Sequence, residues 1–379
     1  MKIPFVFGKL AYSMNFTDRE DEIISLVNNF ESSINTMIIS PRRWGKSSLV
    51  KKAAEVVEHK NKMVKVCFVD VFEVRNEKQF YQVFAEEVLK ATSSKIEEMS
   101  YLVQKFLKNI LPRISFSPDN LSEISLGFDW KHTQKNIGEL LDLADKIAQE
   151  KEIKLVICLD EFQNIADFKD PLALQKKLRS HWQKHQNVSY CLYGSKRHMM
   201  LDIFSSPSMP FYKFGDLMFL EKITEDKWLP FLQNQFTQTK KKIHEKEARL
   251  LTQLVENHPY YVQQLAQLSW LRCKTTCKSS HIYDAHDSLM LQLSLLFQNI
   301  TDSLSNMQVN FLKALIKGEK KLSSKAVLDQ YDLGSSANIA QLKKALANRE
   351  ILDTVGPQIF FTDPVYKKWL ERYYFKIRD

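Results

Sequence analysis

The feature that most constrains the fold is a short segment in which an apolar run, a polar loop and a helical pattern follow one another. Residues 37–39 are Met-Ile-Ile, the loop closes on Gly-Lys-Ser at 45–47, and apolar positions at helical spacing follow. This order is typical of a phosphate-binding loop, in which the Lys46 ammonium reaches the β- and γ-phosphates and the Ser47 hydroxyl ligates Mg²⁺. The sequence therefore predicts a site for a nucleoside triphosphate such as ATP. The residues predicted to contact it are Ser40, Pro41, Arg42, Arg43, Trp44, Gly45, Lys46, Ser47 and Ser48.

The loop departs from the usual G-x-x-x-x-G-K-[ST] spacing at its first position, where Ser40 replaces glycine. Glycine relieves backbone crowding there, and serine fits only with a negative φ. The alternative is a chance Gly-Lys-Ser at the start of a helix. The apolar strand before the loop and a second motif further along the chain argue against chance.

That second motif is an apolar run at 155–159 that ends in Asp160 and Glu161. In a Walker B strand the aspartate holds the Mg²⁺ shell, directly or through water. The glutamate is then placed to polarise the water that attacks the γ-phosphate. Alone, the pattern fits equally well a plain strand with a solvated end. Together with the loop it predicts Asp160 as a metal ligand and Glu161 as a catalytic residue.

A further strand, predicted at 187–195, ends in Gly194 and Ser195. In a parallel sheet the polar residue after this strand can contact the γ-phosphate or the water, which makes Ser195 a candidate catalytic residue and sensor. Serine is also a favoured helix N-cap, and a helical pattern follows. Both interpretations stay open at this stage.

Composition narrows the class of protein. A chain of 379 residues with 44% hydrophobic and 26% charged residues has room for two or three domains and a large core. It has no apolar run of 18 residues and no signal-peptide pattern, so we expect no membrane contact and a cytoplasmic location. The net charge of +9 is only a modest bias toward nucleic acid.

Periodicity predicts three domains. Strands alternate with helices up to about residue 223, which indicates an α/β fold with a parallel sheet covered by helices. In this part we expect a capping box of Thr17 and Glu20 and a long helical stretch over 76–113. The predicted domains are an α/β domain with the phosphate-binding loop at 1–223, a helical domain at 224–300 and a winged helix at 301–379. The last follows from three short helices and an extended pair around Gly356-Pro357.

At this point a family resemblance becomes visible over nearly the whole chain. The sequence resembles the AAA-type P-loop ATPases widespread in archaea and Bacteroidetes, which are related to the STAND signal-transduction NTPases. The similar segments are Phe16–Ile23 for an F-x-x-R-E-x-E box, Ser40–Ser48 for the loop, Asp160–Gln163 for D-E-F-Q, Gly194-Ser195 for the sensor, Asn257–Gln263 for a G-H-P-Y-Y-x-Q lid motif and Phe361–Leu370 for the winged helix. In that family, serine is a known variant at the loop position that Ser40 resembles.

The resemblance implies an ATPase core, a helical lid and a winged helix. It places Pro259 near the adenine, although a proline is also common at the start of a helix. Many relatives carry an arginine after the sensor helix that is suited to reach the γ-phosphate of a neighbouring subunit, whereas residues 210–216 here contain Lys213 and no arginine. Lysine lacks the planar fork of arginine, which puts activation within a ring in doubt. Arg197, Arg42 and Arg43 are other candidates for this role.

Two weaker patterns concern zinc and nucleic acid. Cys273, Cys277, His281 and His286 are ligand types that suit zinc, but their spacing also fits an ordinary helix end, which we favour. The third helix of the winged helix is a candidate DNA-contacting element. Its candidate contacts are Asn338, Gln341, Lys343, Lys344 and Arg349.

Two functions compete on the sequence alone. The first is an ATPase, slow or dependent on a partner, in which Mg²⁺ and ATP set the positions of the lid and the winged helix. The second is a winged-helix DNA-binding protein in which nucleotide supports folding or assembly. A homo-oligomer and an unidentified protein partner are further candidate interactions.

Overall fold

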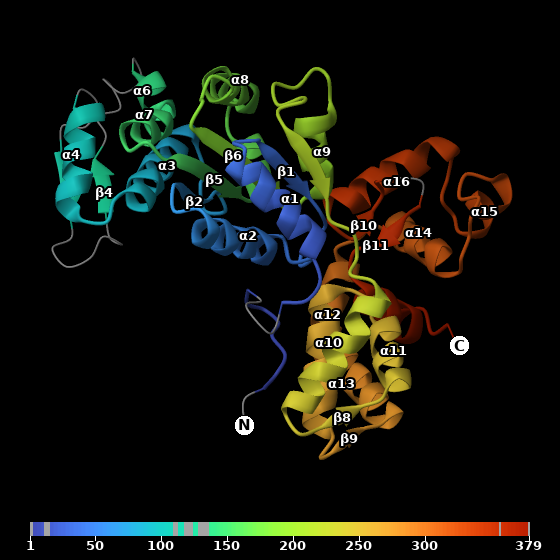
Figure 1. Ribbon diagram of the computed structural model, residues 1–379. Helices are drawn as coiled ribbons and strands as arrows, with labels where there is room; N and C mark the ends of the chain where they lie inside the picture. The colour runs from blue at the N-terminus through green and yellow to red at the C-terminus, as the bar shows by residue number, and fades with distance from the viewer. Residues whose placement is uncertain are drawn as a thin grey trace. The chain divides into compact units, whose positions relative to one another are not determined.

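The computed structural model describes residues 3–10, 16–108, 113–116, 124–127, 136–355 and 358–377. The chain divides into two compact units. The α/β unit consists of Arg19–Ser40 and Gly45–Leu220, and the C-terminal unit consists of Met1–Asp18, Pro41–Trp44 and Glu221–Asp379 (Figure 1). The finer division into three domains at 223 and 300 stays a prediction.

The α/β unit is built on a five-stranded sheet with the strand order β2-β5-β6-β1-β7, and all neighbouring strands are parallel. The strands are β1 (Thr36–Ile39), β2 (Val64–Asp70), β5 (Lys154–Asp160), β6 (Val188–Gly194) and β7 (Asp216–Phe219). β1, β6 and most of β5 are buried, as expected for strands covered on both faces. The predicted α/β fold with a parallel sheet is thus confirmed.

Helices cover both faces of this sheet. The helical segments are α1 (Glu20–Glu31), α2 (Lys46–Lys60), α3 (Glu77–Thr92), α4 (Ile96–Phe106), α6 (Ile137–Leu141), α7 (Leu143–Glu150), η2 (Phe162–Asp167), α8 (Pro171–Trp182) and α9 (Arg197–Ser205). On one face of β5, the side chains of Leu155, Ile157 and Leu159 pack into a core with residues of α3, α7 and α8. Figure 1 shows α1 and α2 along the opposite face.

Two local predictions in this unit are wrong. Helix α1 begins at Glu20 itself, its N-cap is Arg19 with φ 79°, and no side chain caps it, so the capping box with Thr17 does not form. The helical stretch over 76–113 is split into α3 and α4 by an extended Ser93, and a hairpin of β3 (Arg113–Phe116) and β4 (Ile124–Gly127) follows. Ser93 and Ser94 lie at this break, and serine side chains can hydrogen-bond to nearby backbone groups and so compete with helix formation.

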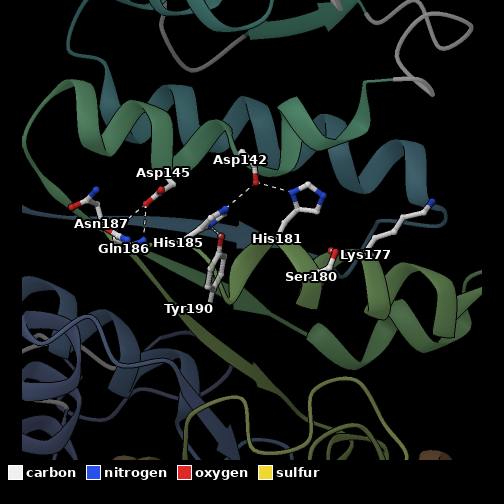
Figure 2. A network of polar contacts seen from close by, with 9 residues as sticks. All are labelled: Asp142, Asp145, Lys177, Ser180, His181, His185, Gln186, Asn187 and Tyr190. Atoms are coloured by element: carbon white, nitrogen blue, oxygen red, sulfur yellow. Dashed lines mark hydrogen bonds and ion pairs between the residues drawn. The ribbon is translucent and has the colours of Figure 1, made fainter.

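A polar network fixes the amino-terminal end of β6 (Figure 2). His185 lies between the Asp142 carboxylate, at 3.2 Å, and the Tyr190 hydroxyl, at 2.8 Å. His181 Nδ1 is 2.7 Å from the same Asp142 oxygen, and Asp145 accepts hydrogen bonds from the backbone N–H groups before the strand. Because this network lies at the start of β6, it sets the strand's position without approaching the carboxyl end, where the strand reaches Gly194.

The C-terminal unit is mostly helical. Its helices are α10 (Glu225–Gln238), α11 (Glu245–Leu254), α12 (Pro259–Arg272), α13 (Ser279–Asp302), α14 (Asn306–Ile316), α15 (Lys325–Gln330), α16 (Ser336–Asn348), α17 (Pro364–Trp369) and the π-helical turn η3 (Leu370–Tyr374). The predicted order of three short helices and an extended pair holds, since β10 (Leu352–Asp353) and β11 (Phe360–Phe361) are antiparallel. The Gly356-Pro357 turn lies outside the described residues.

Two small features of this unit complete the fold. The sequence predicts no strand after about residue 223, yet β8 (Lys242–Ile243) and β9 (Thr276–Cys277) form a short parallel pair. Each contributes only two residues, too few for a periodic signal. Among the described helices, none has the length and apolar character that crossing a membrane requires.

Candidate functional site

The register of the sheet brings three predicted site segments to one edge. Ile39 of β1 pairs with Gly194 of β6, and Leu159 of β5 pairs with Leu192. The residues that follow these strands, Ser40, Glu161 and Ser195, therefore leave the sheet at the same carboxyl edge. In open parallel sheets this is the edge where ligands bind.

The departure at Ser40 has a structural explanation. Ser40 is fully buried and does not adopt the left-handed conformation that would require glycine. The Lys46 ammonium donates to its carbonyl oxygen at 3.2 Å and to its hydroxyl at 3.3 Å. Gly45, with φ 90°, does need the freedom of glycine, and it precedes the first residue of α2. The serine thus contacts the lysine instead of crowding the turn.

The predicted metal ligands are in contact. The Ser47 hydroxyl, on the first turn of α2, donates to Asp160 Oδ2 at 2.7 Å, and Asp160 Oδ1 accepts from the Glu161 N–H at 2.8 Å. Burial raises the pKa of Asp160, the Ser47 hydrogen bond partly offsets this, and the neighbouring charges of Glu161 and Asp70 raise it further. A hydroxyl and a carboxylate are oxygen ligands of the kind Mg²⁺ prefers, and a divalent cation would offset the crowded negative charge. The residues present therefore fit the metal.

Glu161 is held in an unusual conformation beside Ser195. Its φ is 52°, in the left-handed region that costs energy for a residue with a side chain. Ser195 donates to Glu161 Oε2 from its hydroxyl at 2.9 Å and from its backbone N–H at 3.4 Å. Lys196, not Ser195, is the N-cap of α9, so the N-cap interpretation of Ser195 is wrong. Strain of this kind is common at functional sites.

The middle of the loop belongs to the C-terminal unit. In that unit, Arg42 Nη1 lies 3.4 Å from Glu350 Oε2, and the Arg43 guanidinium carbon lies 4.6 Å from the centre of the Tyr260 ring. Both arginines are exposed, whereas Pro41 is buried and the Trp44 indole N–H has no hydrogen-bond partner within the described residues. Ser48 is buried in the first turn of α2.

Other sequence candidates occupy ordinary structural positions. Pro259 is the first residue of α12, as the helix-start interpretation expects, and its predicted adenine contact stays a prediction. Lys213 is exposed with φ 53°. Nowhere in the described residues do three or more histidine, cysteine or acidic side chains gather as a metal site. The zinc candidates are spread over the end of α12, β9 and α13: Cys273, Cys277, His281 and His286.

The winged-helix candidates divide into two groups. Asn338 donates to the Leu333 carbonyl at 3.4 Å, and Arg349 donates to Ser303 at 2.8 and 3.0 Å, so both serve the fold. Gln341 and Lys344 are exposed and Lys343 is half-buried. Direct contacts to bases would therefore depend on fewer side chains than the sequence suggests.

Sequence reasoning gave no role to two residues beside the site. Gln163, in η2, is buried and donates to Glu161 Oε2. Asp70 ends β2 directly opposite Asp160. Gln163 could have been noted because it follows the Walker B pair by two residues, and Asp70 because it ends an apolar run in the same way as Asp160.

Comparisons with known proteins agree with this architecture. Residues 16–265 match the family described as an ATPase domain predominantly from Archaea, and residues 295–372 match a probable winged helix domain. No relative was found among curated proteins.

Among solved structures, the Walker-type ATPase PABY2304 of Pyrococcus abyssi is similar at a TM-score of 0.68 and 16% identity, with 97% of this chain and 99% of that chain covered. The ORC2 protein of Aeropyrum pernix, in ADPNP–ADP complexes, is similar at a TM-score of 0.58 and 13% identity, with 97% and 95% covered. At these identities the likeness concerns the fold. Since the first family covers most of the sequence, the chain belongs to the ATPase domains found predominantly in Archaea.

Proposed function

We propose that this protein binds ATP with Mg²⁺ and hydrolyses it to ADP and phosphate, and that this cycle controls the positions of its helical lid and winged helix. The observation that carries the proposal is the cluster at the carboxyl edge of the sheet. There Asp160, Glu161 and Ser195 lie at or directly after the ends of β5 and β6, and Lys46 and Ser47 begin α2. Lys46 bonds to Ser40, Ser47 to Asp160 and Ser195 to Glu161.

Each residue has a role that its chemistry suits. Lys46 supplies a buried positive charge for the β- and γ-phosphates, and it exchanges its bonds to Ser40 for bonds to phosphate oxygens. Glu161 orients the attacking water and accepts its proton, while a bond forms from the water oxygen to the γ-phosphorus and the bond to the ADP oxygen breaks. Ser195 orients Glu161 and would contact the γ-phosphate.

Ser47 and Asp160 would hold Mg²⁺, and the ion would supply charge that offsets the phosphate oxygens. The raised pKa of Asp160 supports this role, because a buried carboxylate surrounded by other acids is stabilised by a nearby cation. Pro41, Arg42, Arg43, Trp44, Gly45 and Ser48 complete the proposed loop contacts, and Pro259 the proposed adenine contact.

The proposed coupling is supported by contacts inside the C-terminal unit. The loop residues Pro41–Trp44 group with that unit, where Arg42 pairs with Glu350 at the end of the winged helix's third helix and Arg43 lies over Tyr260 of α12. Phosphate oxygens that accept hydrogen bonds from the loop's N–H groups would change these contacts. A ligand shifts an equilibrium only through such differential contacts.

The test separates binding from chemistry. Lys46→Ala is expected to lose ATP binding and turnover, whereas Glu161→Gln is expected to keep ATP affinity and lose turnover by roughly 100-fold or more, the size of a general-base contribution. Isothermal titration with ATP and phosphate release at steady state measure the two. A wild-type protein that binds ATP but does not hydrolyse it would end the enzyme proposal and favour a structural nucleotide.

Hydrogen exchange tests the coupling. Glu161→Gln loaded with ATP is expected to differ from the same variant loaded with ADP in the exchange of α12 and the segment around Glu350. Equal exchange in the two states would separate the ATPase proposal from the coupling proposal and remove the latter.

DNA binding through α16 is the second candidate, favoured by the winged-helix match and by the exposed Gln341 and Lys344. Duplex DNA binding measured from low to physiological salt tests it. Since phosphate contacts release counterions, true binding weakens with salt and Lys344→Ala reduces the slope. Absence of binding at low salt would dismiss this candidate.

A further inference from the structure

Gln163 is the buried polar residue closest in sequence to the proposed catalytic pair that has no assigned role. It lies in η2, and its side chain is 1% exposed. Its amide nitrogen donates to Glu161 Oε2, and also approaches Asn164 Oδ1 at 3.4 Å. Asn164 in turn donates to the carbonyl oxygens of Val71 and Phe72 at 3.3 and 3.4 Å. The amide is therefore anchored to the segment that follows β2.

The hydrogen bonds to Glu161 are unevenly divided between its two oxygens. Oε2 accepts three, from the Gln163 amide, the Ser195 hydroxyl and the Ser195 N–H. Within the described residues, Oε1 accepts none. One oxygen is thus fixed from two sides, by η2 and by the end of β6, and the other keeps its lone pairs for another partner.

The carbonyl half of the Gln163 amide has a cost in stability. Gln163 Oε1 is buried and has no hydrogen-bond partner among the described residues. A buried carbonyl without a donor destabilises the folded state, and an apolar side chain of the same shape would avoid that cost. An unsatisfied group of this kind calls for an explanation, and a catalytic role is one such explanation.

Gly194 provides the space for this arrangement. A Cβ atom at residue 194 would lie 1.7 Å from Gln163 Oε1 and 2.9 Å from its amide carbon. The backbone of Gly194 therefore lies against the amide, directly before Ser195. The absence of a side chain at the end of β6 lets Gln163 reach Glu161.

We propose that Gln163 is a positioning residue for hydrolysis. Together with Ser195 it fixes Oε2 of Glu161 and thereby aims Oε1 at the attacking water, whose proton Oε1 accepts. This inference rests on the proposed ATPase function and adds to it a residue that touches neither nucleotide nor water.

The experiment compares two buried glutamines. Gln163→Met keeps the length of the side chain and removes the amide. Gln175→Met is the matched control, because Gln175 is also 1% exposed, also has a carbonyl oxygen without a partner, and lies in α8 of the same unit. Phosphate release gives kcat and KM, and thermal melting gives stability.

Gln163→Met is expected to lower kcat roughly 10-fold, the lower end of losses seen when an orienting partner is removed, with KM changed less than about two-fold and the melting temperature unchanged or raised. Gln175→Met is expected to leave kcat unchanged. In the Glu161→Gln background, adding Gln163→Met is expected to change the residual single-turnover rate less than about two-fold, because the oriented carboxylate is already gone.

Three results would overturn the proposal: an unchanged or higher kcat in Gln163→Met, an equal loss in the Glu161→Gln background, or an equal loss in Gln175→Met. If Gln163→Met melts at a lower temperature, Gly194→Ala provides a second route, since its methyl group displaces the amide. Gly194→Ala must then lower kcat, and combining it with Gln163→Met must not lower kcat further. A wild-type protein without turnover would instead reject the ATPase proposal itself, so the two failures are distinguishable.

Discussion

The two units of the molecule differ in how particular polar side chains are arranged. In the α/β unit, acidic side chains crowd one edge of the sheet, where Asp70, Asp160 and Glu161 place negative charges close together and Gln163 has an unsatisfied carbonyl. In the C-terminal unit, two polar pairs join residues that are far apart in the sequence. Tyr261 donates to Asp363 at 2.5 Å, and the hydroxyls of Thr301 and Tyr366 are 2.9 Å apart. The crowded acids cost stability and suit a cationic ligand. In the C-terminal unit burial also raises the pKa of Asp363, but the hydrogen bonds from Tyr261 and from two backbone N–H groups offset part of this.

The largest expected effect comes from removing a charge at the sheet edge. Asp160→Asn should lower turnover roughly 100-fold or more, the scale of metal-assisted charge stabilisation. Because burial and neighbouring acids raise the pKa of Asp160, its carboxylate destabilises the fold above the raised pKa, and that cost disappears below the ordinary value of 3.8. At neutral pH the nucleotide-free variant should melt at the same or a higher temperature. A clearly lower melting temperature would contradict the comparison.

Removing the carboxylate of a polar pair in the C-terminal unit should instead lower the stability of the fold. Asp363 caps α17 by accepting from the N–H groups of Val365 and Tyr366, both at 2.9 Å, in addition to the Tyr261 hydroxyl. Asp363→Ala should cost about 2 kcal/mol, from the lost cap and the unpaired hydroxyl. Tyr261→Phe, the control, should cost about 1 kcal/mol because the cap remains. Urea unfolding measures both, and equal costs would show that the cap contributes nothing.

The smallest expected effect is a difference in acid sensitivity. Burial lowers the pKa of His258 to about 3 and that of His286 to about 4, from an ordinary 6.5, with the nearby charges of Lys222 and Arg43 adding to the effect at His258. The unfolded chain then binds more protons below pH 6.5, so the C-terminal unit should lose stability as pH falls, by at most about 1.4 kcal/mol per pH unit for each histidine.

The α/β unit should lose stability only at a lower pH than the C-terminal unit. Burial raises the pKa of Asp142, but the hydrogen bonds from His181 and His185 outweigh it and the pKa is lowered from 3.8. Stability from this network is present above 3.8 and is lost only as pH falls through the lowered value. Hydrogen exchange by mass spectrometry from pH 7 to 4.5 should show α12 and α13 opening first, and His286→Gln should reduce that slope. Simultaneous opening of both units would contradict this difference.

Much of the fold could be predicted from sequence because its signals are local. The apolar runs that form β1, β5 and β6 determine which polar residues emerge at the carboxyl edge. The sequence therefore predicts Ser47, Asp160, Glu161 and Ser195 as site candidates, and the structure places Ser47 against Asp160 and Ser195 against Glu161. Parallel strands bring their carboxyl ends together whatever the intervening sequence. The match of the family to residues 16–265 agrees with this interpretation.

The features that sequence missed depend on geometry rather than pattern. The expected Thr17 cap failed because α1 begins one residue after a left-handed Arg19, and backbone conformation at a single residue carries no periodic signal. The role of Gln163 depends on the absence of a Cβ at Gly194, thirty-odd residues away, and on the left-handed φ of Glu161. Such relations appear only when strands are placed side by side.

The central claim is that the polar cluster at the sheet edge carries out hydrolysis through Glu161. A single-turnover experiment tests it most directly, with Mg²⁺ added to limiting labelled ATP already bound to wild-type protein or to Glu161→Gln, and phosphate formation followed in time. The account predicts equal ATP binding, phosphate formation in the wild type, and a rate roughly 100-fold or more lower in the variant. Equal rates in the two proteins, or no phosphate from the wild type, would contradict it.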